Sequence, residues 1–81
     1  MDPVMVKGIR FFVDSLLEGG YQLRAVTNTP ERQTTAASFA KFAGLRVIDD
    51  GRTDSHIFTA NIRLGDVRRL ADIVNSFNRS N

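Results

Sequence analysis

The chain has 81 residues, enough for a single domain spanning 1–81, and its apolar (42%) and charged (25%) fractions are those of a globular domain and argue against a disordered protein. It contains no cysteine, which excludes disulfides, thiolate nucleophiles and cysteine-based zinc sites. The formal net charge is only +2, yet nine of the eleven basic residues are arginines, the side chain best suited to bidentate contact with phosphate or carboxylate.

The sequence predicts a cytoplasmic protein without membrane contact. No apolar run is long enough to span a bilayer. Near the N-terminus, Asp2 stands where a secretory signal has a positive charge, and Lys7 and Arg10 interrupt the apolar residues that follow.

The first periodic segment runs from Asp2 to Leu17 and is predicted to be an amphipathic helix. Asp2 and Pro3 are typical of a helix start, and Gly19-Gly20 is typical of a helix end. Between them, apolar residues follow the i, i+3, i+4 spacing of one helical face: Met5, Ile9, Phe12, Val13 and Leu16.

The middle of the chain is predicted to contain a strand and a second helix. Alternation of side chains over residues 21–27 indicates the strand. The helix begins at Thr29-Pro30, which supplies a capping hydroxyl and a first-turn proline, and it ends at Ala43 before Gly44.

The last third is predicted to form a hairpin and a helix. Strands over 45–49 and 55–62 flank Asp50-Gly51, a pair that favours tight turns. The final helix begins at Gly65-Asp66 and ends near Phe77, and residues 78–81 are expected to form a frayed tail.

The predicted order is therefore α-β-α-β-β-α. It indicates a two-layer α/β domain of the α+β class, in which a three-stranded sheet packs on three helices.

The sequence favours a non-catalytic protein with no cofactor and no metal site. His56, the only histidine, is better explained as a solvent-facing residue at a strand edge than as a general base beside Asp54 or Asp50. Asp49, Asp50 and Asp54 do not have the spacing of an EF-hand loop, and turn formation accounts for them.

A first hypothesis is nucleic-acid binding. Ala40 and Gly44 have the spacing of a helix-turn-helix corner, and the hairpin that follows is similar to a wing. Residues 33–63 thus loosely resemble a winged-helix domain, although only one helix is predicted where such domains have two. The resemblance implies nucleic-acid contact. The expected contact residues are Arg32, Lys41, Arg46, Arg52, His56 and Arg63.

A second hypothesis is protein binding. Strand alternation places Val26, Ile48 and Ile57 on the outer face of the sheet, and apolar residues there indicate a protein partner or a homo-oligomer. Two functions stay open: a small nucleic-acid-binding or regulatory protein that self-associates, and a protein-interaction module, such as an inhibitor or adaptor, that binds no nucleic acid.

Overall fold

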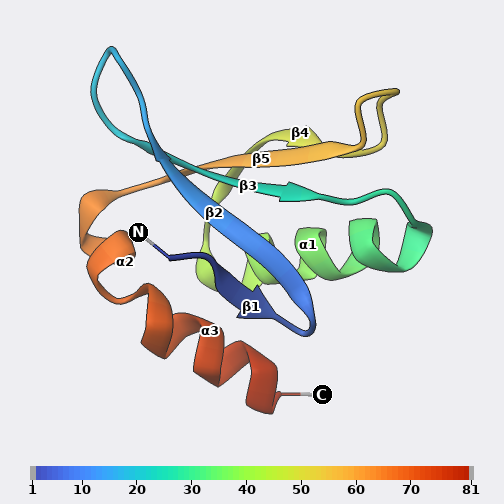
Figure 1. Cartoon of the computed structure of the whole chain (residues 1–81). Helices are drawn as coiled ribbons and strands as arrows, with labels where there is room; N and C mark the ends of the chain where they lie inside the picture. Colours follow the sequence, from blue (N-terminus) through green and yellow to red (C-terminus); the bar gives the residue numbers. More distant parts are fainter. Residues whose placement is uncertain (1, 81) are drawn as a thin grey trace.

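The chain begins with a β-hairpin, as a computed structural model describing residues 2–80 shows (Figure 1). Val4–Val6 (β1) and Ile9–Ser15 (β2) pair antiparallel across Lys7 and Gly8, with Val6 opposite Ile9. Lys7 and Gly8 have φ of 47° and 85°, and positive φ at both central residues defines the hairpin turn that matches strand twist. The helix predicted over residues 2–17 is therefore wrong.

The remaining elements lie close to their predicted positions, except that the single final helix predicted from Gly65 is two helices, divided at Arg69 where the backbone leaves the helical conformation. The helix at 30–43 has its predicted bounds, and the strands predicted at 45–49 and 55–62 are shifted by at most two residues. In chain order the elements are β3 (Tyr21–Val26), α1 (Pro30–Ala43), β4 (Arg46–Asp50), β5 (Ile57–Ile62), α2 (Leu64–Arg68) and α3 (Leu70–Arg79).

All five strands of residues 2–80 form one antiparallel sheet in the order β1-β2-β3-β5-β4. The predicted three-stranded sheet is thus corrected to five strands, because the segment expected to be a helix supplies β1 and β2. The mixed α+β class stands. The winged-helix layout does not stand, because Gly44, with a φ of 69°, ends α1, and β4 begins two residues later with no second helix between them.

Helix α1 begins and ends for the local reasons that its sequence suggests. Oγ1 of Thr29 accepts a hydrogen bond from the backbone N–H of Arg32 at 3.2 Å, which satisfies one of the free N–H groups of the first turn. Pro30 occupies the first turn, where its missing N–H costs nothing.

The core lies between one face of the sheet and the helices α1 and α3. Its centre is a series of aromatic contacts in which the ring of Phe39 (α1) lies 5.5 Å from Phe11 (β2) and 5.3 Å from Phe77 (α3). Phe58 (β5) continues the series, 5.9 Å from Phe11. These rings tie both layers together and leave the second face of the sheet outside the core.

The short edge strand β1 is held by the end of α3. The side chain of Asn78 accepts a hydrogen bond from the backbone N–H of Lys7 and donates one to the carbonyl of Met5, both at 2.9 Å. The tail predicted to fray at 78–81 is helical as far as Arg79, and residue 81 lies outside the described residues.

Candidate functional site

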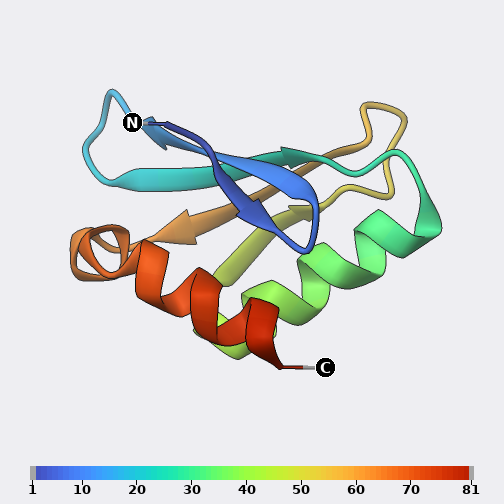
Figure 2. The ribbon, with the colours of Figure 1, turned by 60° about the horizontal axis from the view of Figure 1, so that its bottom comes forward.

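One face of the five-stranded sheet carries no helix of residues 2–80. Figure 2 shows α1 and α3 on the same side of the sheet, with the opposite side uncovered. Buried side chains such as Phe11, Leu23 and Phe58 point toward the helices. Because side chains alternate along a strand, the residues between them point to the uncovered side, which we call the open face.

The strand register arranges the open face in rows that run across the strands. A polar row contains Asp14, Gln22, Asn61 and Arg46, each opposite the next. The central row contains Phe12, Arg24, Thr59 and Asp49. Beyond it, Val26 lies opposite Ile57 and forms an apolar pair. Polar and apolar character are thus separated along the strand direction.

Arg24 is fixed at the centre of the open face. Its Nε donates to Oδ2 of Asp14 at 2.8 Å, and its Nη2 donates to Oδ1 at 3.2 Å. Its guanidinium carbon lies 4.8 Å from the centre of the Phe12 ring. Phe12, Asp14 and Arg24 therefore form a preorganised cluster that we call the central triad.

The central triad shifts the titration of both charged members. The hydrogen bond from Arg24, helped by its charge, holds the pKa of Asp14 below its usual value, although partial burial opposes this effect. The same hydrogen bond raises the pKa of Arg24. Asp14 and Arg24 therefore stay ionised together at neutral pH.

Apolar side chains on and beside the open face are unusually exposed. The exposed fraction is 46% for Met5, 47% for Val26 and 56% for Ile48. Of the three residues predicted to form an interface, the structure brings Val26 and Ile57 together. Ile48 lies apart from them, at the irregularity of β4 where the register shifts between Val47 and Asp49.

The interface predicted from the sequence did not include Met5, Phe12 or Asp14, because the segment that contains them was expected to be a helix. The signal that could have placed them is the Lys7-Gly8 pair between Val6 and Ile9, which suits a two-residue turn.

The six residues expected to contact nucleic acid do not form one patch. Arg32 lies in the first turn of α1. The β4–β5 loop, which contains Arg52 and His56, lies beside this end of α1, because Gln33 of α1 donates a hydrogen bond to the carbonyl of Gly51. Lys41 lies in the last turn, and Arg46 and Arg63 line a hollow near that end. The two groups are separated by the length of α1, about 20 Å.

The β4–β5 loop is held by backbone hydrogen bonds. The carbonyl of exposed His56 accepts from the N–H of Thr27 at 2.8 Å. Carboxylates of Asp49 and Asp50 accept from the N–H groups of Gly51 and Arg52 at 2.9 and 3.0 Å. This is the turn role expected of these acids. Within residues 2–80, no three His, Asp or Glu side chains cluster as metal ligands.

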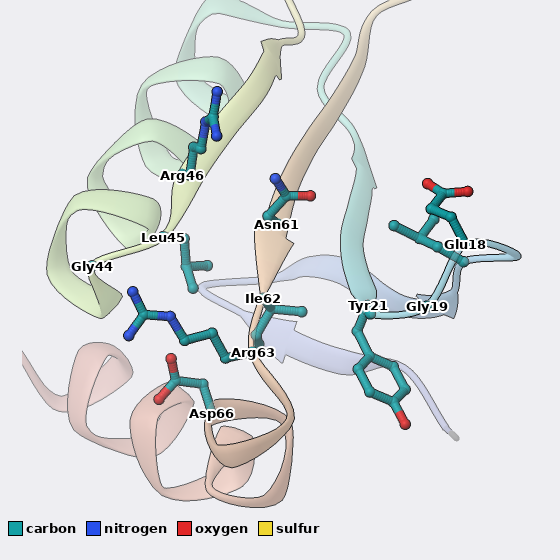
Figure 3. A pocket seen from close by; sticks show the side chains of 12 residues that line it. Glu18, Gly19, Tyr21, Gly44, Leu45, Arg46, Asn61, Ile62, Arg63 and Asp66 are labelled. Carbon is teal, nitrogen blue, oxygen red and sulfur yellow. The ribbon is translucent and has the colours of Figure 1, made fainter.

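A hollow of about 510 Å³ lies at the end of the sheet next to the polar row, between the β2–β3 turn and the end of α1 (Figure 3). It is lined by two cations, Arg46 and Arg63, and two acids, Glu18 and Asp66. The two guanidinium groups point in different directions in Figure 3. Asp66 accepts a hydrogen bond from Arg69 at 2.8 Å. With balanced and divergent charges, the hollow has no strong preference for an anion or a cation.

Comparison of the chain with protein-family models, curated proteins and solved structures found no match. None of the helices in residues 2–80 is long and apolar enough to cross a membrane.

Proposed function

We propose that the chain is a non-catalytic protein-interaction domain that binds a protein through the open face. The observation that carries the proposal is the uncovered face itself, on which the apolar pair Val26–Ile57 lies beside the ordered central triad. Exposed apolar side chains bordered by polar residues are typical of protein interfaces, and aromatic and arginine side chains are enriched there.

Charge balance favours a protein over a nucleic acid as the ligand. The open face has three arginines, Arg10, Arg24 and Arg46, and two aspartates, Asp14 and Asp49, and Arg24 is already paired. Binding to the phosphate backbone needs a surplus of cations on one surface. Single-stranded nucleic acids also stack on aromatic rings, but the guanidinium of Arg24 lies over the ring of Phe12.

The non-catalytic part of the proposal rests on the lack of a convergent reactive group among residues 2–80. His56 is exposed, and its backbone anchors the loop. The Asp14 carboxylate, with its lowered pKa, is engaged by Arg24 and is a poor general base at neutral pH.

Val26→Asp tests the proposal, because it places a charge in the apolar pair. Leu17→Asp is the matched control, since Leu17 is fully exposed in the β2–β3 turn, off the sheet. Proteins captured from a lysate by the tagged chain are identified and then titrated as purified components. We expect a protein whose affinity falls at least about tenfold for Val26→Asp and is unchanged for Leu17→Asp.

Equal binding by both variants would overturn the proposed role of the open face. Titrations with duplex DNA and single-stranded RNA at two salt concentrations test the rival function. An affinity that falls as salt rises, and that Val26→Asp leaves unchanged, would identify a nucleic-acid-binding protein instead.

A further inference from the structure

We infer that the protein seated on the open face is a second copy of this chain, packed face to face about a two-fold axis parallel to the strands. The inference rests on the proposed function and specifies its partner. It follows from the polar row and the apolar pair, each of which is complementary to itself under this operation.

The operation is defined by the strand order. An axis lying in the interface, midway between β3 and β5, brings β3 of one copy over β5 of the other and β2 over β4. Each row then faces the same row of the second copy, with its order reversed.

The polar row becomes complementary in charge and in hydrogen bonding. Asp14 of one copy faces Arg46 of the second, and the amide of Gln22 faces the amide of Asn61. Both contacts occur twice, because a two-fold interface repeats every pair. Amides carry both donors and acceptors, so they can satisfy each other across the interface.

The apolar pair matches under this operation, and the central row matches at Arg24 but not at its ends, where Phe12 faces Asp49. Val26 of one copy faces Ile57 of the second, so apolar surface is buried against apolar surface. Arg24 faces the hydroxyl of Thr59, which can accept from the guanidinium N–H groups that Asp14 leaves free.

The alternative two-fold axis, perpendicular to the strands, gives a poorer match. It would exchange the ends of each strand and bring Gln22 over Val26 and Asn61 over Ile57. Amide groups would then be buried against aliphatic side chains without hydrogen-bond partners, which is costly. The axis parallel to the strands is therefore the favoured arrangement.

The size of the open face sets the expected strength of the dimer. The four strands that face each other, about 4.8 Å apart and about six residues long, present a surface of about 400 Å² per copy, because β1 faces no strand of the second copy. A total of about 800 Å² is below the usual size of specific interfaces, so we expect a weak dimer with a Kd on the order of 10–100 micromolar. The ordered central triad strengthens the dimer, because its side chains are already fixed and lose little conformational freedom on docking.

Analytical ultracentrifugation over a wide concentration range tests the inference. The wild type should show a monomer–dimer equilibrium. Arg46→Asp places an acid against Asp14 of the other copy and should raise the dimer Kd at least about tenfold. Arg32→Asp, the same charge change in the exposed first turn of α1, should leave the Kd unchanged.

Chemical cross-linking tests the orientation independently, because facing sheets pack about 10 Å apart, which is too far for a disulfide. A mixture of Val26→Cys and Ile57→Cys copies should be joined by a short bis-maleimide cross-linker. A mixture of Val26→Cys and Leu17→Cys copies should not, because Leu17 lies off the sheet.

A wild type that stays monomeric at all concentrations would overturn the inference. So would a dimer that neither Arg46→Asp nor Val26→Asp weakens, or preferential cross-linking of the Leu17 mixture. If the chain is monomeric but another protein binds it in a manner sensitive to Val26→Asp, only the second-copy inference fails. If the chain neither dimerises nor binds another protein in a manner sensitive to Val26→Asp, the proposed function fails as well.

Discussion

Gly51 lies against Thr27 so closely that a Cβ atom at residue 51 would be 1.9 Å from Thr27 Oγ1. Gly51 is buried at φ +79° and opens the β4–β5 loop, while Thr27 is fully buried directly after β3. Nε2 of Gln33 donates to the carbonyls of both residues, at 3.3 and 3.2 Å. The contact thus joins the loop, the end of β3 and the start of α1.

Replacing Gly51 by alanine is expected to destabilise the protein by about 2–4 kcal/mol, because it combines overpacking with a strained φ. For a domain of this size the melting temperature should fall by at least about 10 °C. Gly65→Ala in α2 is the control, since no atom lies within 4 Å of its added Cβ. Thermal unfolding followed by circular dichroism measures both, and equal melting temperatures would contradict the packing at Gly51.

Phe39→Ala should be the most damaging of the aromatic truncations. The ring is fully buried and contacts Phe11 and Phe77. Its removal should cost about 3–5 kcal/mol, enough to unfold a small domain at room temperature. Phe42→Ala, on the same helix but half exposed, should cost about 1 kcal/mol. Urea unfolding of the two variants tests this order.

Asn78→Ala should loosen β1. The change removes two hydrogen bonds that hold the β1–β2 turn to α3, at a cost of about 1–2 kcal/mol. Hydrogen exchange should quicken at the β1 amides more than in the central strand β3. Asn75→Ala, an exposed position on α3, is the control and should leave the exchange of β1 unchanged.

Stability should decrease in acid, in part through Asp14. Arg24 lowers the folded-state pKa of Asp14 below its ordinary value of 3.8, so the ion pair contributes fully above that pH. The contribution is lost as the pH falls through the folded-state pKa. Because both side chains are about one-third exposed, it amounts to less than about 1 kcal/mol.

Asp14→Asn isolates this effect. It should reduce stability slightly at pH 7 and flatten the acid side of the curve of unfolding free energy against pH. Denaturant unfolding at several pH values measures both curves, with Asp54→Asn in the exposed β4–β5 loop as the control. A variant that keeps the wild-type slope below pH 4 would contradict the role of Asp14.

The open face could be predicted in part from the sequence. Alternation over β3 and β5 placed Val26 and Ile57 on one side, and the register makes them direct neighbours. Ile48 lies apart because β4 has an irregularity, which alternation does not reveal. The ion pair between Arg24 and Asp14 was not predicted, because the segment that contains Asp14 was expected to be a helix.

The sequence by itself determined the elements that have local signals. Helix α1 is bounded by the hydroxyl of Thr29 and by Gly44, and the β4–β5 loop begins at the turn glycine Gly51; capping and backbone preferences act within a few residues. Only the tertiary structure decided the first third. Its apolar residues fit a helix through Ile9 and Phe12 and a strand through Ile9 and Phe11. Pairing of Phe11 with Ala25 of β3 and its burial against Phe39 favour the strand, and these contacts come from residues distant in the sequence.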